Sequence, residues 1–202
     1  SLVTDKTRLI IINSPQNPTG GVLTPDDLEA IASICAERGI AVLADEIYNR
    51  IIYEGEFRSI WTYPGMDELT IILDGMSKTY AMTGWRLGHG IMPADLAVRV
   101  ARLQTNSNSC TASFSQRAML EAITGDQSAV DQMVATFKGR RDLVVDLLND
   151  IDGVSCLKPA GAFYVFPNVK SFKRPVKQIA DHLLQQAKVA TLGGTAFGSD
   201  GE

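Results

Sequence analysis

The sequence predicts an α/β fold, with a mostly parallel sheet and flanking helices, followed by a smaller α+β region. One observation is a strand–helix–strand unit at 8–44, because two strands joined through a helix run parallel. Another is the change of pattern after a long helix predicted at 128–150, beyond which short strand-like runs alternate with one helix. We therefore expect two domains, 1–145 and 146–202.

The first unit has well-marked boundaries. The apolar run RLIII at 8–12 predicts a strand buried on both faces, and the turn-rich NSPQNPTGG follows it. Thr24 is a good N-cap with Pro25 in the first helical turn, and Gly39 is suited to end that helix. The run IAVLA at 40–44 predicts the second strand, which stops at Asp45.

Further elements follow from the same patterns. Apolar runs predict strands at 69–73 and 87–92. Apolar residues at helical spacing predict helices at 94–104, 114–124 and 128–150. In the C-terminal region the predicted strands are 154–157, 162–166 and 189–192, and the predicted helix is 175–188.

Composition excludes several functions. The net charge of −4 and the scattered basic residues disfavour nucleic acid as a partner. Three cysteines without a CxxC or Cys/His cluster predict no disulfide scaffold and no metal site, and they fit a reducing cytoplasm. No apolar run is long enough for a membrane helix. The start at Ser1 rather than Met suggests a piece of a longer chain.

Polar side chains follow three of the predicted strands. Ligands of open parallel sheets bind at the carboxyl ends of the strands, so we expect these side chains to converge. The set is Asn17, Asp45, Tyr48, Ser77 and Lys78, with Arg86 eight residues further on. An amine, a carboxylate, a phenol, an amide and a guanidinium are poorly suited to hydrolysis. They suit an aldehyde cofactor that carries a phosphate and a ring nitrogen.

The stretch GMSKTYAMTGWRLG at 75–88 resembles the cofactor-attachment signature of the class I/II aminotransferases, which depend on pyridoxal 5'-phosphate (PLP). The motifs NSPQNPTGG and ADEIYNRIIYEG resemble two more motifs of that family, in the same order. GAFYVFP and GGTAFG resemble its small-domain motifs. The resemblance implies the PLP-dependent transferase fold, with 1–145 the C-terminal part of the large PLP-binding domain and 146–202 part of the small domain.

The resemblance also implies catalytic roles. Lys78 would form the Schiff base with PLP and then move a proton during transamination. Asp45 would pair with the pyridinium nitrogen and keep it protonated, because a nearby carboxylate favours the charged ring. Tyr48 would hydrogen-bond the 3-oxygen of the ring.

Cofactor binding would use further residues. Asn17 would share the 3-oxygen with Tyr48. Arg86 would hold the phosphate as a bidentate fork, and Ser77 would add a hydroxyl.

Each residue also has a purely structural interpretation. Asp45 could cap a helix starting near Glu46, and Tyr48 could be a half-buried aromatic. Asn17 is a good turn former, and Arg86 could be a surface charge. The joint pattern, rather than any one residue, favours the functional interpretation.

The expected activity is transfer of an amino group between an amino acid and a 2-oxo acid, by a protein that is a homodimer when complete. Family members are longer, and their N-terminal half supplies a phosphate-binding loop, a ring-stacking aromatic and a tyrosine from the partner subunit. The arginine for the substrate carboxylate lies beyond the segment that matches the end of this chain, so we expect the chain alone to be a poor catalyst. Two alternatives stay open: a C–S lyase of the same fold, and a non-catalytic aminotransferase-like module of a regulator.

Overall fold

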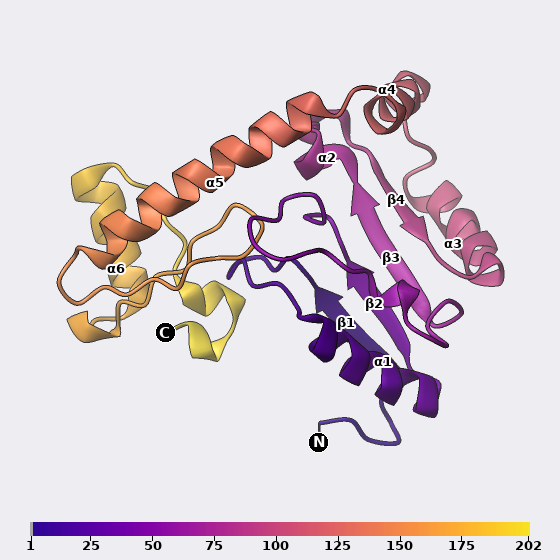
Figure 1. The fold of residues 1–202 in the computed structure, drawn as a ribbon, viewed down its shortest axis with the longest axis horizontal. Coiled ribbons are helices and arrows are strands. Elements are labelled where there is room, and N and C mark those ends of the chain that lie inside the picture. Colours follow the sequence, from indigo (N-terminus) through magenta and orange to yellow (C-terminus); the bar gives the residue numbers. More distant parts are fainter. Residues whose placement is uncertain (1) are drawn as a thin grey trace.

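The computed structural model describes residues 2–202 and has one four-stranded sheet, in the order β1-β2-β3-β4. The strands are β1 (Leu9–Asn13), β2 (Ala41–Asp45), β3 (Thr70–Gly75) and β4 (Gly88–Ile91). The first three are parallel, and β4 runs antiparallel to β3 (Figure 1). Only a short helix and a turn connect β3 to β4, which is too little chain for a parallel crossover. The predicted α/β sheet is therefore confirmed, with one antiparallel edge strand.

Helix α1 (Pro25–Arg38) forms between β1 and β2 with the predicted ends. The Thr24 hydroxyl accepts the Asp27 N–H, and the Asp27 carboxylate accepts the Thr24 N–H, so the first turn has a complete capping box. At the other end Gly39 adopts φ 62°, a left-handed conformation that glycine reaches without a Cβ clash.

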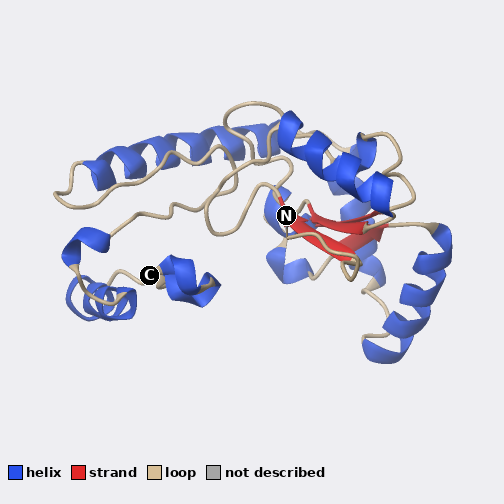
Figure 2. Cartoon of the chain, turned by 90° about the horizontal axis from the view of Figure 1, so that it is seen from below, coloured by secondary structure: helices blue, strands red, loops and turns tan. Residues whose placement is uncertain are grey.

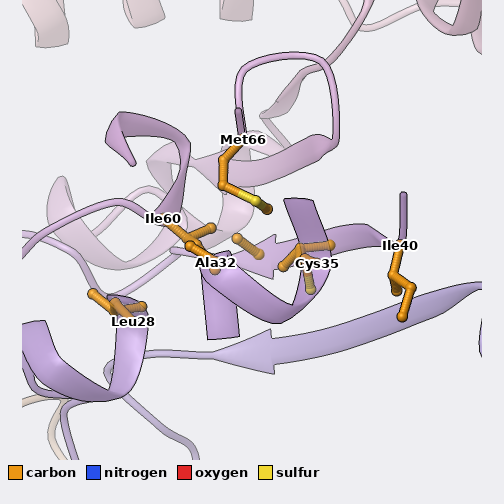
Figure 3. Packing of buried hydrophobic residues seen from close by; sticks show 8 residues of the cluster. Leu28, Ala32, Cys35, Ile40, Ile60 and Met66 are labelled. Atoms are coloured by element: carbon orange, nitrogen blue, oxygen red, sulfur yellow. The ribbon is translucent and has the colours of Figure 1, made fainter. Parts of the chain in front are cut away.

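The main core lies between α1 and the sheet. Figure 3 shows α1 side chains facing residues of the segment between β2 and β3. The buried residues of this core are Leu28, Ala32, Cys35, Ile40, Val42, Ala44, Ile60 and Met66. On β1, however, Ile11 is 68% exposed, so the prediction that this strand is buried on both faces is wrong for the chain as it stands.

The predicted helices are present. They are α3 (Ala94–Ser107), α4 (Ser113–Thr124), α5 (Ser128–Asn149) and α6 (Val176–His182), which continues into a π-helical turn at Leu183–Ala187. The short helix α2 (Met76–Thr79) was not predicted. Helix α5 extends from the end of the sheet near α2 toward α6 (Figures 1 and 2). No helix among residues 2–202 has the length and apolar character needed to span a membrane.

The strands predicted at 154–157, 162–166 and 189–192 do not form within the described part of the chain. Only two isolated bridges occur in the region, Ser155 with Asn168 and Gly161 with Ile52. Ala162 has φ +56°, which breaks an extended run, and Leu192 is 68% exposed. Apolar β-branched residues give strand propensity, but a strand also needs a neighbour to pair with.

Candidate active site

Lys78 lies on α2, directly after the carboxyl end of β3, and its side chain is half-buried. The amine Nζ is 5.8 Å from the ring centroid of Tyr48 and 5.7 Å from that of Phe163. Both distances fall within the range of cation–π attraction. No ion pair to Lys78 is found among residues 2–202, so its amine is not committed to a carboxylate.

Asp45 and Tyr48 follow β2 on the neighbouring strand end. The Ile47 N–H donates to Asp45 Oδ1 over 3.3 Å. Residues 47–50 form turns, so Asp45 does not cap a helix there. Tyr48 is 3% exposed, and its hydroxyl lies 2.5 Å from that of Tyr164.

The environment of Tyr48 keeps its phenol protonated. Burial raises the pKa of Tyr48 well above its ordinary value, and the hydrogen bond with Tyr164 raises it further. Asp45 adds a smaller increase in that pKa through its charge, whereas a hydrogen bond with the Asn17 side chain lowers it. Tyr48 therefore acts as a neutral hydrogen-bonding group over the physiological pH range.

The remaining predicted site residues differ in placement. The Asn17 N–H donates to Asn13 Oδ1 over 2.8 Å, which holds its loop at the end of β1. Arg86 is exposed with φ 54°, and its Nη1 donates to the Thr83 carbonyl over 2.8 Å. The structure thus brings Asn17, Asp45, Tyr48 and Lys78 together. No hydrogen bond or ion pair within residues 2–202 joins Arg86 or Ser77 to that group.

Sequence reasoning gave no role to Phe163 and Tyr164, which complete the aromatic wall beside Lys78. Their rings lie 5.4 and 5.7 Å from that of Tyr48, both edge-on. The available signal was the motif GAFYVFP, but its apolar pattern also predicted an ordinary strand.

A second feature that the sequence did not reveal is a pair of hydrogen bonds to Asp74, just before α2. Asp74 Oδ1 accepts the Gly75 N–H over 2.6 Å, and Asp74 Oδ2 accepts Asn49 Nδ2 over 2.8 Å. Burial raises the pKa of the Asp74 carboxyl, although these two hydrogen bonds lower it. Asp74 therefore joins Gly75, the residue just before α2, to the turn after β2.

The donor set fits one kind of molecule. An uncommitted amine can react with an aldehyde, a carboxylate can hold a protonated ring nitrogen, and a phenol with an amide can hold a ring oxygen. An exposed guanidinium supplies the fork that phosphates prefer. The residues present therefore fit an aromatic aldehyde phosphate.

Comparison with known proteins leads to the same chemistry. The sequence model of the family described as "Aminotransferase class I and II" matches residues 1–202. An aromatic-amino-acid aminotransferase of Thermococcus litoralis is 42% identical over 203 residues, which cover 99% of this chain and 52% of that protein. An aspartate aminotransferase of Pyrococcus abyssi is also 42% identical, with the same coverage. The chain spans about half the length of the curated relatives it matches.

Solved structures share the fold. An aromatic aminotransferase from Pyrococcus horikoshii superposes with a TM-score of 0.94 at 42% identity, covering 98% of this chain and 54% of that one. The aspartate aminotransferase from Rhizobium meliloti gives 0.92 at 34% identity, covering 97% of this chain and 52% of that one. The chain therefore has part of the PLP-dependent aminotransferase fold, and aminotransferases of this family use PLP.

Proposed function

This chain belongs to the class I and II aminotransferase family, and we propose that its protein moves an amino group between an amino acid and a 2-oxo acid, with PLP as cofactor. The observation that carries the proposal is the amine of Lys78. It is half-buried at the end of β3, lies over two aromatic rings and has no carboxylate partner among residues 2–202. A lysine in such a place is available as a nucleophile and a base.

In this proposal PLP, when bound, supplies an aldehyde that takes up the amino group and a ring that draws electrons from the breaking bond. Lys78 would hold the cofactor through Nζ, and the same amine, once free, would move a proton. Asp45 keeps a proton on the ring nitrogen, because its negative charge favours the cationic ring. These two residues, with Tyr48, form the catalytic group.

Binding and orientation fall to the residues around them. Tyr48 and Asn17 hold the ring oxygen, and their mutual hydrogen bond supports this pairing. Arg86 and Ser77 hold the phosphate. The exposed guanidinium of Arg86 supports that role, since within residues 2–202 its hydrogen bond goes to the Thr83 carbonyl and not to a carboxylate.

We also propose the wider context. Residues 1–145 belong to the large PLP-binding domain and 146–202 to the small domain. The complete protein works as a homodimer, a proposal supported by exposed apolar side chains on α3 and α4 such as Leu103 and Phe114. The three free cysteines support a cytoplasmic location, and the proposed amino transfer implies a role in amino acid metabolism.

The deciding experiment uses the full-length protein. Borohydride reduction in the presence of PLP is expected to fix the cofactor on Lys78, as read by peptide mapping, and the untreated protein is expected to transfer an amino group to 2-oxoglutarate. Label on another lysine would contradict the assignment. Release of ammonia without an amino acceptor would indicate a lyase, and PLP binding without any turnover would indicate a non-catalytic module.

A further inference from the structure

Tyr164 holds the buried hydroxyl of Tyr48. The two oxygens are 2.5 Å apart, although the residues are 116 positions apart in the sequence. The rings meet at 81°, and Phe163 packs against both. Tyr48 is almost wholly buried, so its hydroxyl would be costly to leave without a hydrogen-bond partner.

A phenol has one proton to donate, so the pair fixes its direction. If Tyr48 donates to Tyr164, its oxygen can only accept from other groups. If Tyr164 donates, the proton of Tyr48 is free to point elsewhere. Besides Tyr164, the side chains acting on the phenol are Asn17, which hydrogen-bonds it, and the charged groups Asp45 and Lys78. Tyr164 therefore governs what the Tyr48 hydroxyl can offer a ligand.

The segment bearing Tyr164 is held firmly against the turn after β2. The Ala162 N–H donates to the Ile51 carbonyl over 2.9 Å, and the Tyr53 N–H donates to the Ala160 carbonyl over 2.8 Å. The Tyr53 hydroxyl donates in turn to the Ala162 carbonyl. Ala162 itself is fully buried at φ +56°, a conformation that requires support from its surroundings.

Arg141 on α5 locks the same two segments together. Its guanidinium is bidentate to Glu54, with distances of 2.9 and 2.8 Å, and Nη1 also donates to the Pro159 carbonyl over 2.5 Å. It stacks over the Tyr53 ring at 4.7 Å and is only 5% exposed. A planar fork can make these contacts at once, whereas a lysine cannot.

We propose that Tyr164 is a positioning residue that sets the orientation of the Tyr48 hydroxyl, and that Arg141 keeps Tyr164 in register with it. The pairing itself stands on the geometry of the chain. Its effect on PLP rests on the proposed function, so the two are tested by separate measurements.

The first measurement needs no cofactor and no activity. In the full-length protein without PLP, Tyr48→Phe, Tyr164→Phe and the double variant are unfolded with denaturant. We expect the double variant to lose little more stability than either single variant, because each change removes the same hydrogen bond while keeping the rings. The control is Tyr63→Phe, whose hydroxyl bonds the Pro25 carbonyl away from the site. Its effect is expected to add to that of Tyr48→Phe. Additive losses for Tyr48 and Tyr164 would overturn the pairing.

The second measurement reads the cofactor directly. The absorbance of bound PLP is titrated with pH in wild type, Tyr164→Phe and Tyr63→Phe. We expect the midpoint to shift in Tyr164→Phe alone, a result that lost packing would not produce since the ring remains. An unchanged midpoint with PLP still fixed on Lys78 would overturn the positioning role. Failure of all variants to bind PLP would instead refute the proposed function. The unfolding comparison of the single and double variants would still decide whether Tyr48 and Tyr164 are paired.

Discussion

Two cations of this protein lie over aromatic rings, and their polar surroundings differ completely. Lys78 has the rings of Tyr48 and Phe163 and no ion pair within residues 2–202. Arg141 has the ring of Tyr53 together with Glu54, Asp142 and a carbonyl. Carboxylates that satisfy a buried cation fix it in place and remove it from chemistry. The comparison therefore separates Arg141, whose contacts are structural, from Lys78, to which we assign the reaction in the proposal above.

The largest expected effect is at Lys78. Lys78→Arg keeps a positive charge over the two rings but removes the reactive amine. We expect amino transfer to fall by at least about 100-fold, the lower end of what a positioned acid–base group contributes, with the unfolding midpoint almost unchanged. Steady-state kinetics measure the loss of amino transfer, and denaturant unfolding measures the midpoint. Substantial turnover in this variant would show that the amine is dispensable.

Arg141 is expected to give the opposite result, a loss of stability rather than of chemistry. Arg141→Met should lower the free energy of unfolding by about 1.5–3 kcal/mol, the size of one hydrogen bond to a charged group, because the carboxylates left behind still reach solvent. The matched control is Lys138→Met, whose ion pair with Asp142 is exposed. That change should cost less than about 1 kcal/mol. Equal losses in both variants would contradict the structural role of Arg141.

Arg86 represents a third kind of cation, which is exposed and donates a hydrogen bond to the Thr83 carbonyl. Arg86→Ala should weaken PLP binding by roughly tenfold to a hundredfold, since one charge-assisted hydrogen bond is lost. Asp45→Ala should instead impair turnover more than PLP binding, because its charge acts on the ring. Titration of PLP into both variants, followed by kinetics at saturating PLP, separates the effects. Matching affinity losses with no further catalytic defect in Asp45→Ala would refute this division.

The smallest expected effect is on how the stability of the fold depends on pH. The hydrogen bonds from Arg141 lower the pKa of Glu54, and the contact with Lys158 is the main cause that lowers the pKa of Asp142 to about 2. Both carboxylates therefore stabilise the fold above their ordinary pKa values, and this contribution is lost as pH falls through their lowered pKa values, which for Asp142 is about 2.

Asp74 should behave in the opposite sense. Burial raises its pKa, so the charged form costs stability above that pKa, and protonation at lower pH relieves the cost. Asp74→Asn should therefore flatten the pH profile of stability on the acidic side of neutrality, where the Asp74 carboxyl titrates. Unfolding midpoints from pH 3 to 8 would show this, and a profile identical to wild type would contradict it.

The first half of the chain was more predictable than the second for a physical reason. The ends of α1 follow from local chemistry at Thr24, Pro25 and Gly39, and β2 follows from a run of apolar residues. The convergence of Asn17, Asp45 and Lys78 follows from the rule that parallel strands end at one edge. The strand expected at 162–166 failed because Ala162 takes φ +56°, a conformation imposed by contacts with Ile51 and Tyr53 that no local pattern encodes.

The pairing of Tyr48 with Tyr164 has a consequence for the order of folding. Closing a loop of 116 residues is entropically costly, and contacts of this range form only after local structure exists to support them. During synthesis, the residues of α1, the sheet and Lys78 leave the ribosome well before residue 164 does. The aromatic wall is therefore expected to be among the last parts of the candidate site to assemble, and until then the Lys78 side chain lacks the rings on that side.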